Sequence, residues 1–594
     1  MARKKKIVEE VEFTPSKYQT AIFEQMQHGV GNIVIEAAAG SGKTSTLIKA
    51  IKLIPLDKKI LFCAFNKDIV KELQKKIGKV ENVDIRTVHS LGYLMVQRNV
   101  NGPQLAINEN KYRAHVLNNL KHYTHIDLWS LGKVQYLKYV DNICKLIDFC
   151  RYNLVDTARG ALLLVDRHDI DIIDDEIEVA LKVMEWGKVN LDEVDYTDMV
   201  WLPNVLYMKP LGLQYDYVLG DEAQDFSIAQ RELLLKCQKM GTRFIFAGDK
   251  NQSIYSFASA SPDTFDKLKK LPNTVTLPLS ISYRCAKKIV KFAQNLVPSI
   301  EPNEDPRNGE IEFNSSLNNI NDGDMVLCRN NAPLMKAYNE FIRMGKKCKI
   351  RGKDIGLNLK RMVESTHQDL LNVDLSQDGV FVRLYDKFFD ERDKLIRRTG
   401  LDLPTVMNMS MVSNKLDMIR ALEVLSEDIN TTEELVGKIK NMFSDKKTDG
   451  ISLSTIHKAK GLEANNVFIV CRSLMPSKSA TQPWEIEQER NLMYVAYTRA
   501  KNKLSFIDEK EFSSVISNSQ DTLGAIENQV NQVLGKTRKP ITLSKETAKV
   551  LASSFKRIEP QATCATTSIG LGNTKKAQKP LNILTQKKLT RIKR

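Results

Sequence analysis

The chain has 594 residues, of which 42% are hydrophobic and 27% charged, and its net charge is +16 at pH 7. A chain of this length exceeds one hydrophobic core, so roughly three to five structural units are expected. No apolar run approaches the ~20 residues of a membrane span, which argues against membrane insertion, and no signal peptide follows Met1. The nine cysteines are scattered without a C-x-x-C pair, which argues against a zinc or iron–sulfur site and favours a reducing compartment.

The first strong pattern is a phosphate-binding loop at residues 37–44. Residues 12–19 are predicted to open a helix, capped by Thr14 or Ser16, and an apolar strand follows at residues 32–36. The loop Ala-Ala-Ala-Gly-Ser-Gly-Lys-Thr then leads into a predicted helix at residues 45–51. Strand, glycine-rich loop and helix is the context that phosphate binding requires.

Each residue of this loop has an expected role. Gly40 and Gly42 let the backbone N–H groups of Ala39–Thr44, Ser41 included, turn toward phosphate oxygens, and the helix N-terminus adds positive potential. Lys43 is expected to reach the β- and γ-phosphates and Thr44 to ligate Mg²⁺. Nucleotide binding is therefore the starting hypothesis.

Two further apolar strands are predicted at residues 59–65 and 83–86, each ending in polar or aromatic residues of the kind found at the carboxyl edge of a parallel sheet. Residues 94–190 then show three–four spacing of apolar side chains and predict a helical insertion.

An apolar strand at residues 215–220 ends in Asp221 and Glu222. The first acid is expected to hold Mg²⁺ and the second to orient and polarise the attacking water. The next strand, at residues 242–247, is followed by Gln252, a candidate sensor of the γ-phosphate, and by Tyr255 and Phe257, which are either base-stacking platforms or core aromatics.

Taken together, these segments resemble superfamily 1A DNA helicases, the UvrD/Rep/PcrA-like group, and most closely its F-box-helicase and phage-like branch. The resemblance covers roughly residues 12–510 in the family's order: Gln19, the loop 37–44, 64–67, 87–90, 221–225, 248–257, 279–284, 326–330, 451–463 and 489–500. Two residues depart from the family pattern: Ala258 stands where an arginine is usual, and Gly220 where a larger apolar residue is usual.

The resemblance implies an α/β fold with two RecA-like parallel-sheet P-loop domains and helical insertions in each. We expect the first domain at residues 1–93 and 191–278 with its insertion at 94–190. The second is expected at 279–356 and 450–511 with a short insertion at 357–449, followed by a C-terminal extension at 512–594.

The resemblance also implies roles for residues outside the loop. Gln19 would read adenine, Tyr283 would stack on it, and Arg284 and Arg499 would reach the γ-phosphate, with Glu463 beside the nucleotide. Contacts to single-stranded DNA would come from Phe65, Asn66, His89, Tyr255, Phe257, Thr455 and His457. The implied cofactors are ATP and Mg²⁺.

The leading hypothesis is an ATP-dependent DNA helicase, 3′ to 5′ by resemblance, that acts on single-stranded DNA and single-strand/duplex junctions in repair, recombination or replication. The alternative is a translocase that strips proteins from single strands with little unwinding. A P-loop scaffold is disfavoured by the two arginines, and RNA stays open as a substrate because stacking does not read the 2′-OH.

The last twenty residues, Lys575–Arg594, hold eight Lys or Arg and no acid, which is half of the net charge of +16. One interpretation is that this basic end binds a partner, either a polyanion or a replication or repair protein. The other is that it is a solvated, flexible tail. The expected location is the cytoplasm of a bacterial or virus-infected cell, or the nucleus if the cell is eukaryotic.

Overall fold

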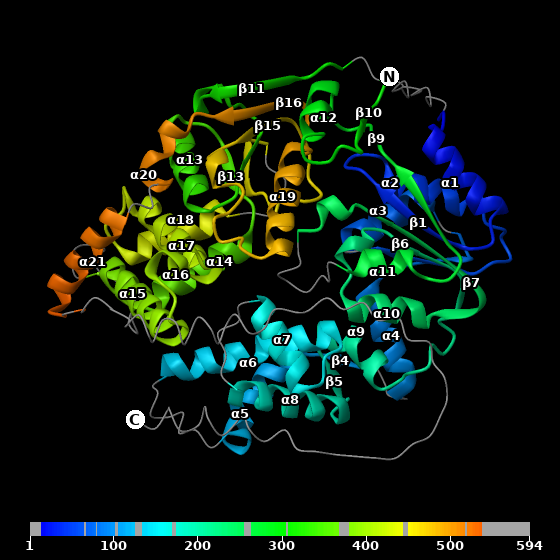
Figure 1. Cartoon of the computed structure of the whole chain (residues 1–594), viewed down its shortest axis with the longest axis horizontal. Coiled ribbons are helices and arrows are strands. Elements are labelled where there is room, and N and C mark those ends of the chain that lie inside the picture. The colour runs from blue at the N-terminus through cyan, green and yellow to red at the C-terminus, as the bar shows by residue number, and fades with distance from the viewer. Residues whose placement is uncertain are drawn as a thin grey trace, which may run out of the picture.

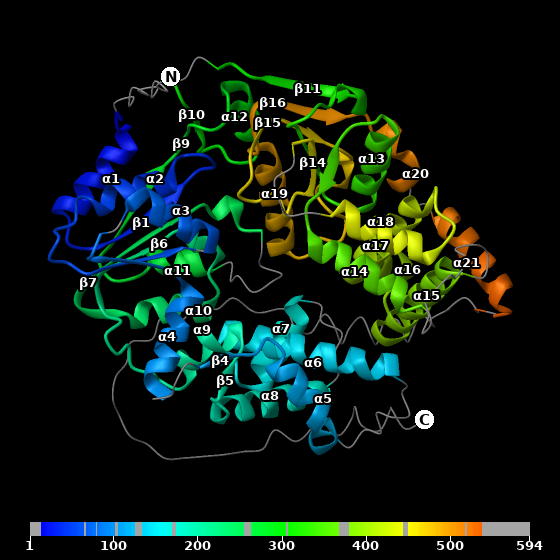
Figure 2. The ribbon, with the colours of Figure 1, turned by 180° about the vertical axis from the view of Figure 1, so that it is seen from behind.

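The computed structural model describes residues 13–64, 67–78, 80–100, 105–124, 133–168, 174–254, 263–304, 307–366, 379–443, 449–516, 520–536 and 538. Two sheets with their helices form two lobes, and the helices of a first insertion lie below both of them in Figure 1 and again in the view from behind (Figure 2). Within the described residues, no helix combines the length and the apolar character that crossing a membrane requires.

The first sheet has six parallel strands in the order β3-β2-β6-β7-β1-β8. Their bounds are β1 Asn32–Ala37, β2 Ile60–Ala64, β3 Val83–Thr87, β6 Tyr215–Gly220, β7 Gln238–Gly248 and β8 Thr274–Leu279. Alternate residues of β1, β2 and β7 enter different cores, as Ile33 and Val34 do. One core includes α1 Lys17–His28, α2 Lys43–Ile51 and α3 Lys67–Ile77; the other includes α4 Val88–Val100, α9 Tyr196–Val205, α10 Ile228–Lys236 and α11 Thr264–Lys269.

The second sheet also has six parallel strands, in the order β11-β16-β15-β12-β14-β13. Their bounds are β11 Glu310–Ser315, β12 Met325–Cys328, β13 Cys348–Ile350, β14 Ile451–Thr455, β15 Ala464–Ile469 and β16 Ala500–Ile507. Helices α12 Lys287–Ala293 and α19 Pro483–Tyr497 contribute to one core, and α13 Ala332–Arg343 to the other. A short pair, β9 Ile281–Ser282 and β10 Glu301–Pro302, lies between the sheets in sequence. The expected fold of two RecA-like parallel-sheet domains is confirmed.

The glycine at position 220, where the family pattern has a larger residue, has a steric explanation. A Cβ built on it would lie 2.8 Å from the Phe246 ring and 3.1 Å from the Phe226 ring. Both rings are buried, so they fill the space that a larger residue at position 220 would occupy. Ala258, the second departure from the family pattern, lies outside the described residues.

The first insertion is helical, with α5 Lys111–Tyr123, α6 Lys133–Asn153, α7 Ala158–His168 and α8 Asp174–Val189, and a short pair β4 Ala106–Ile107 and β5 Glu193–Val194. A buried charge network joins it to α9: Arg151 lies 2.7 Å from Asp195 and 2.9 Å from Asp198, and Lys111 lies 2.7 Å from Asp198. Buried charges require such pairing. The domain boundary expected at residue 93 falls inside helix α4. The division into domains stays a prediction.

The second insertion shares one hydrophobic core with the second sheet and the C-terminal extension. Its helices are α14 Lys353–Glu364, α15 Val380–Thr399, α16 Leu403–Asn408, α17 Ser410–Ser426 and α18 Thr432–Met442. The Asp417 carboxylate accepts hydrogen bonds from the N–H groups of Asn331 and Ala332 at 2.8 and 3.0 Å, at the start of α13. The extension forms α20 Ser513–Ile516 and α21 Gln520–Leu534; residues 539–594, with the basic tail, lie outside the described residues.

Helix α21 is fastened to α15 by an ion pair that we expect to stabilise the second lobe. Arg392 donates to both carboxylate oxygens of Glu527 at 2.7 Å, and the side chains are 10% and 20% exposed. Glu527→Ala should lower the free energy of unfolding by about 1–3 kcal/mol, since the charge-assisted bonds are lost in a largely buried place.

The control for this prediction is an ion pair of α15, beside Arg392 in sequence. Glu391 pairs with Lys415, but these side chains are 39% and 28% exposed, so Glu391→Ala should cost less than about 1 kcal/mol. Thermal melting of the two variants checks the difference. Equal midpoints would contradict a stabilising role for the α15–α21 pair.

Candidate nucleotide site between the two sheets

The loop between β1 and α2 has the backbone that phosphate binding requires. Gly40 and Gly42 have φ of +72° and +80°, in the left-handed region that favours glycine. A Cβ on Gly40 would lie 2.5 Å from the Arg284 Cβ, and the Tyr283 N–H donates to the Gly40 carbonyl at 2.9 Å. The loop is therefore in close contact with the segment that begins the second lobe.

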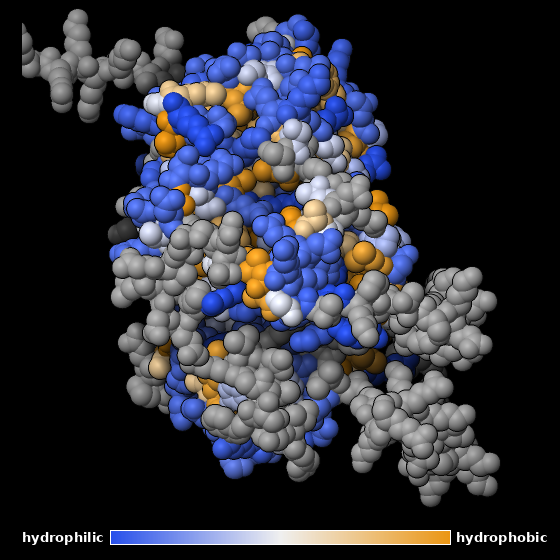
Figure 3. All heavy atoms as spheres, turned by 90° about the vertical axis from the view of Figure 1, so that its left-hand side faces the viewer, coloured by the Kyte–Doolittle hydropathy of each residue, from blue (hydrophilic) through white to orange (hydrophobic). Residues whose placement is uncertain are grey.

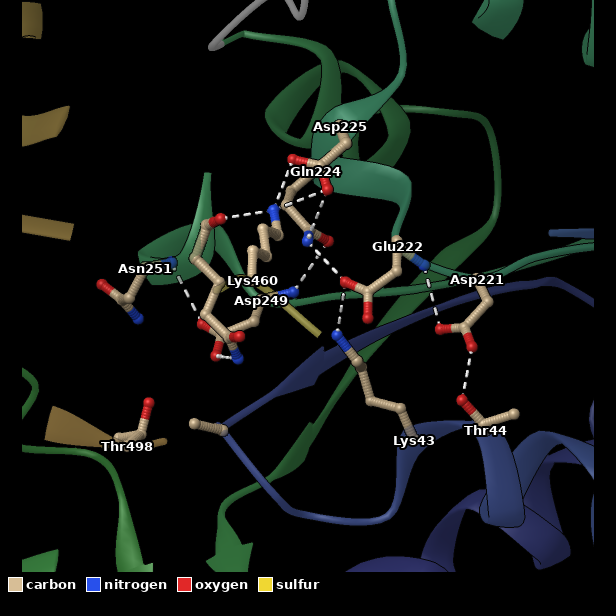
Figure 4. A network of polar contacts seen from close by, with 12 residues as sticks. Lys43, Thr44, Asp221, Glu222, Gln224, Asp225, Asp249, Asn251, Lys460 and Thr498 are labelled. Atoms are coloured by element: carbon tan, nitrogen blue, oxygen red, sulfur yellow. Dashed lines mark hydrogen bonds and ion pairs between the residues drawn. The ribbon is translucent and has the colours of Figure 1, made fainter. Parts of the chain in front are cut away.

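Two side chains at the start of α2 contact the acids after β6 (Figure 4). The Lys43 ammonium lies 2.8 Å from Glu222 Oε2, and the Thr44 hydroxyl donates to Asp221 Oδ2 at 2.6 Å. Glu222 has a φ of +54°, an uncommon conformation outside glycine, which places its carboxylate beside Lys43. Such strain is concentrated at functional sites.

The electrostatics separate the two acids. Burial alone would raise the pKa of Glu222, but the Lys43 and Lys460 ammonium groups hold it at about 2. Burial, together with repulsion by Glu222, raises the pKa of Asp221. Burial works against the charge on Lys43, yet Glu222, Asp221 and Asp249 raise its pKa. Glu222 is therefore ionised at neutral pH, as a group that orients and polarises water must be.

A chain of polar contacts crosses from the first lobe to the second. Gln252, in the 3-10 turn Lys250–Gln252 after β7, donates to Asp249 at 2.6 Å and accepts from Arg499 at 3.1 Å. Arg499 is 1% exposed, and burial, followed by the nearby Arg284 guanidinium, lowers its pKa. The candidate γ-phosphate sensor and the candidate arginine finger are thus in direct contact.

Arg284 and Tyr283 lie at the edge of this site. The Arg284 side chain is 19% exposed, and its Nε donates to Glu463 at 2.6 Å; Glu463 also pairs with Lys501 at 2.6 Å. Tyr283 is 38% exposed, as a side chain that stacks on a base requires. The roles expected of Tyr283, Arg284 and Glu463 stay predictions.

Gln19 is placed differently from the expectation of a free amide. Its oxygen accepts from the Ser16 N–H at 3.0 Å, in the capping box of α1, and its nitrogen donates to the Thr46 hydroxyl at 3.0 Å. It is 3% exposed. Adenine reading by Gln19 requires exchange of these bonds and stays a prediction.

The sequence did not single out two residues that the structure brings to the site. The Tyr494 hydroxyl accepts from the Ala39 N–H of the loop at 3.0 Å. Lys460 contacts both Asp225 oxygens at 2.8 and 2.6 Å and the Gln252 carbonyl at 2.6 Å. Both Tyr494 and Lys460 come from the second lobe, more than 200 positions from their partners, and local patterns do not reveal such contacts.

The residues present fit a nucleoside triphosphate with Mg²⁺. The hydroxyls of Ser41, in the loop, and Ser282, 3.0 Å from the Gly40 Cβ position, are buried and find no hydrogen-bond partner among the described residues. Buried hydroxyls normally have a partner, and phosphate oxygens accept from them. The oxygen donor pair Thr44 and Asp221 suits Mg²⁺.

The candidate DNA residues fall in two groups. His89 lies at the start of α4, and Thr455 and His457 follow at the carboxyl end of β14, with Thr455 7% exposed. Phe65, Asn66, Tyr255 and Phe257 lie outside the described residues. The DNA-contact assignments therefore stay predictions.

His457 provides a pH-dependent prediction. Burial, followed by the Arg329 and Lys458 cations, lowers its pKa to about 3, from about 6.5 for an unperturbed histidine. The unfolded chain binds the proton more tightly, so stability is complete above pH 6.5 and falls as the pH falls below it. Between pH 7.5 and 5.5 the wild type should lose about 1 kcal/mol through this residue.

His457→Gln should remove that share of the loss, whereas His28→Gln, at an exposed position of α1, should leave it unchanged. Chemical denaturation at the two pH values measures both. The same pH dependence in His457→Gln as in the wild type would contradict a neutral ring at this position.

Comparison with known proteins gives two family matches. Residues 18–273 match the UvrD/REP helicase N-terminal domain, and residues 402–511 match the UvrD-like helicase C-terminal domain. The first match spans the phosphate loop and the acids after β6, and the second spans Lys460, Tyr494 and Arg499. Together they contain the facing halves of the site.

Similar whole proteins carry related names. The chain is 24% identical over 541 residues to F-box DNA helicase protein 1 of Schizosaccharomyces pombe, covering 80% of this chain and 55% of that protein. It is 22% identical to a probable DNA helicase II homolog of Mycoplasma pneumoniae, covering 63% and 64% of the two chains. It is 21% identical to the ATP-dependent DNA helicase Rep of Buchnera aphidicola subsp. Acyrthosiphon pisum, covering 80% and 92%. The chain thus spans less than two thirds of the length of the first two relatives.

Proposed function

Because the chain belongs to the UvrD/Rep/PcrA-like superfamily 1A helicases, we propose that it is an ATP-dependent DNA helicase that moves along single-stranded DNA and separates duplex strands. The observation that supports this most is that one polar network joins Lys43 and Glu222 of the first lobe to Lys460 and Arg499 of the second. A nucleotide bound there contacts both lobes.

The side chains that would bind ATP are bonded to other protein groups in the structure. Lys43 exchanges Glu222 for the β- and γ-phosphates, and Arg499 exchanges the Gln252 oxygen for the γ-phosphate. Burial, and after it the nearby Arg284 guanidinium, lower the pKa of Arg499, and a bound triphosphate would offset both effects. Thr44 and Asp221 are the residues that would hold Mg²⁺, which would supply further positive charge to the phosphates.

Glu222 can act in hydrolysis once its ion pair with Lys43 is broken. Once Lys43 has turned to the phosphates, the ionised Glu222 carboxylate orients a water and accepts its proton. Loss of the γ-phosphate weakens the hold of Arg284 and Arg499, and the lobes relax. Only the difference in ATP affinity between the two arrangements biases this motion.

The DNA strand is proposed to run across the carboxyl ends of both sheets, where His89, Thr455 and His457 lie. Phosphate contacts hold it, and the aromatics Tyr255 and Phe257 stack on bases without reading sequence. Movement of one lobe against the other then advances the strand. By relationship to the family we propose 3′-to-5′ movement, in repair, recombination or replication.

The second candidate is a translocase that strips proteins from single strands with little unwinding. The second insertion favours it: it is short, and it shares its core with the second sheet and with α21. An insertion held in this way has little freedom to rearrange around duplex DNA.

Strand displacement tests the proposal. Duplexes with a 3′ tail, a 5′ tail or blunt ends are incubated with ATP and Mg²⁺, with Lys43→Ala as the inactive control. We expect unwinding of the 3′-tailed substrate alone. Unwinding from the 5′ tail only would overturn the polarity, and ATP-driven release of a protein block without strand separation would favour the second candidate.

A further inference from the structure

A groove unrelated to the nucleotide site lies between α14 and α18 in the second insertion. Its volume is about 210 Å³, and it is lined by Lys353, Gly356, Leu357, Lys360, Ile439, Lys440 and Phe443. None of these residues belongs to the proposed ATP or DNA contacts. Both helices belong to the lobe of the second sheet (Figures 1 and 2).

The floor of the groove is apolar and built by close packing. Gly356 permits this, because a Cβ there would lie 2.7 Å from the Phe443 ring. Ile439 and Phe443 are 1% and 7% exposed, whereas Leu357 is 52% exposed at the edge. Where it is coloured, the face on the side of α20 and α21 is mostly hydrophilic, with separate hydrophobic areas (Figure 3).

The rim of the groove is cationic. Lys353 and Lys360 lie two turns apart on the same face of α14, and Lys440 faces them from α18. Lys360 pairs with Glu364 at 3.2 Å. Within the described residues, Lys353 and Lys440 form no ion pair. The one acid near the start of α14, Asp354, is engaged by Lys458 at 2.8 Å.

We propose that this groove binds a short acidic segment of a protein partner that carries one large apolar side chain. The volume is below the 300–1,000 Å³ of sites for whole small molecules, which suits a single anchoring side chain over Leu357 and Phe443. Carboxylates on either side of that anchor meet the three lysines, which gives orientation and faster association. Interfaces are typically held by such a buried anchor within a polar rim.

A nucleic-acid backbone fits the groove less well. Phosphates need only the lysines and gain nothing from an apolar floor with a half-exposed leucine. The proposal does not depend on helicase activity, because the groove shares no residue with the nucleotide site.

Binding of a defined peptide tests the proposal on the full-length protein. The probe is an end-capped, fluorescein-labelled peptide with one phenylalanine flanked on each side by three aspartates, followed by fluorescence anisotropy without ATP or DNA. We expect binding that weakens about tenfold or more when the phenylalanine is replaced by alanine. Leu357→Asp and the double variant Lys353→Glu/Lys440→Glu should each weaken binding by a similar factor.

Matched variants elsewhere control for charge and surface changes. Leu163→Asp changes a leucine that is 55% exposed on α7, and Lys394→Glu changes an exposed lysine on α15; both should bind within about twofold of wild type. Basal ATP hydrolysis should be unchanged in every variant, which shows that the lobes are folded.

Three results would overturn the proposal. The first is no binding at about 1 mM peptide. The second is equal binding of the alanine peptide. The third is loss of binding in the lysine double variant but not in Leu357→Asp, with displacement by short duplex DNA, which would make the groove a general polyanion site.

Discussion

Replacing Arg499 with alanine is expected to lower the rate of ATP hydrolysis by about 10³–10⁵-fold, the range that arginine fingers contribute. Arg499 is buried, and its guanidinium is held by the Val495 and Leu462 carbonyls at 3.0 and 3.1 Å while one Nη reaches Gln252. These bonds hold the guanidinium group of Arg499 facing the first lobe. The side chain therefore needs little reorganisation when a γ-phosphate binds. Nucleotide affinity should change far less than turnover.

Steady-state hydrolysis and fluorescent-nucleotide binding measure the two effects separately. Arg343→Ala is the matched control, since Arg343 is an exposed arginine on α13 that pairs with Glu340, Glu427 and Asp428, and it should keep wild-type turnover. Arg499→Lys retains the charge but not the fork and should remain strongly impaired. Near-normal turnover in Arg499→Ala would show that Arg499 does not act on the γ-phosphate.

Glu222→Gln is expected to lower turnover by about 10²–10⁴-fold, the usual contribution of a general base. The amide has nearly the same shape, but it accepts no proton and no longer pairs with Lys43, which lies 2.8 Å away. Loss of that pair frees Lys43 for phosphates, so ATP should bind at least as tightly as to wild type. Accumulation of bound, unhydrolysed ATP in a single-turnover experiment checks this.

Glu232→Gln is the control for this variant. Glu232 lies on α10 of the same lobe and pairs with Arg231 at 2.7 Å, with 39% of its side chain exposed, and its replacement should leave turnover unchanged. Wild-type turnover in Glu222→Gln would assign the base to another carboxylate of the same polar network, such as Asp225 or Asp249.

The sequence predicted the part of the site that is contiguous in the chain. Strand, glycine loop and helix succeed one another at residues 32–51, and the acids follow their strand directly, so local rules place Lys43, Thr44, Asp221 and Glu222 at one sheet edge. Most strands of the first sheet were predictable for a related reason: buried parallel strands are short apolar runs, and β2 is buried at every position. The second sheet was expected from the resemblance.

What the sequence did not predict depends on how distant surfaces meet. Tyr494 and Lys460 join the site only because α19 and the segment after β14 dock against the first lobe. Strand β8, at the sheet edge, is exposed or part-exposed at five of its six positions, lacks a buried apolar run and was not predicted. The packing of α21 on α15 likewise rests on Arg392 and Glu527, residues more than 130 positions apart.

Gln19 shows the limit of assigning a role by residue type. An amide suits adenine, but it suits a helix cap equally well, and the structure uses both of its ends within the protein. Only the three-dimensional neighbours, Ser16 and Thr46, distinguish the two uses.

The central claim is that one ATP site, built by both lobes, responds to a single strand of DNA. The most direct measurement is ATP turnover with and without an unstructured oligonucleotide such as oligo(dT), on wild type and on Arg499→Ala. We predict that the strand raises wild-type turnover about tenfold or more, since it aligns the second lobe with the first, and that Arg499→Ala shows no such rise. Turnover that is the same with and without the strand would contradict the account.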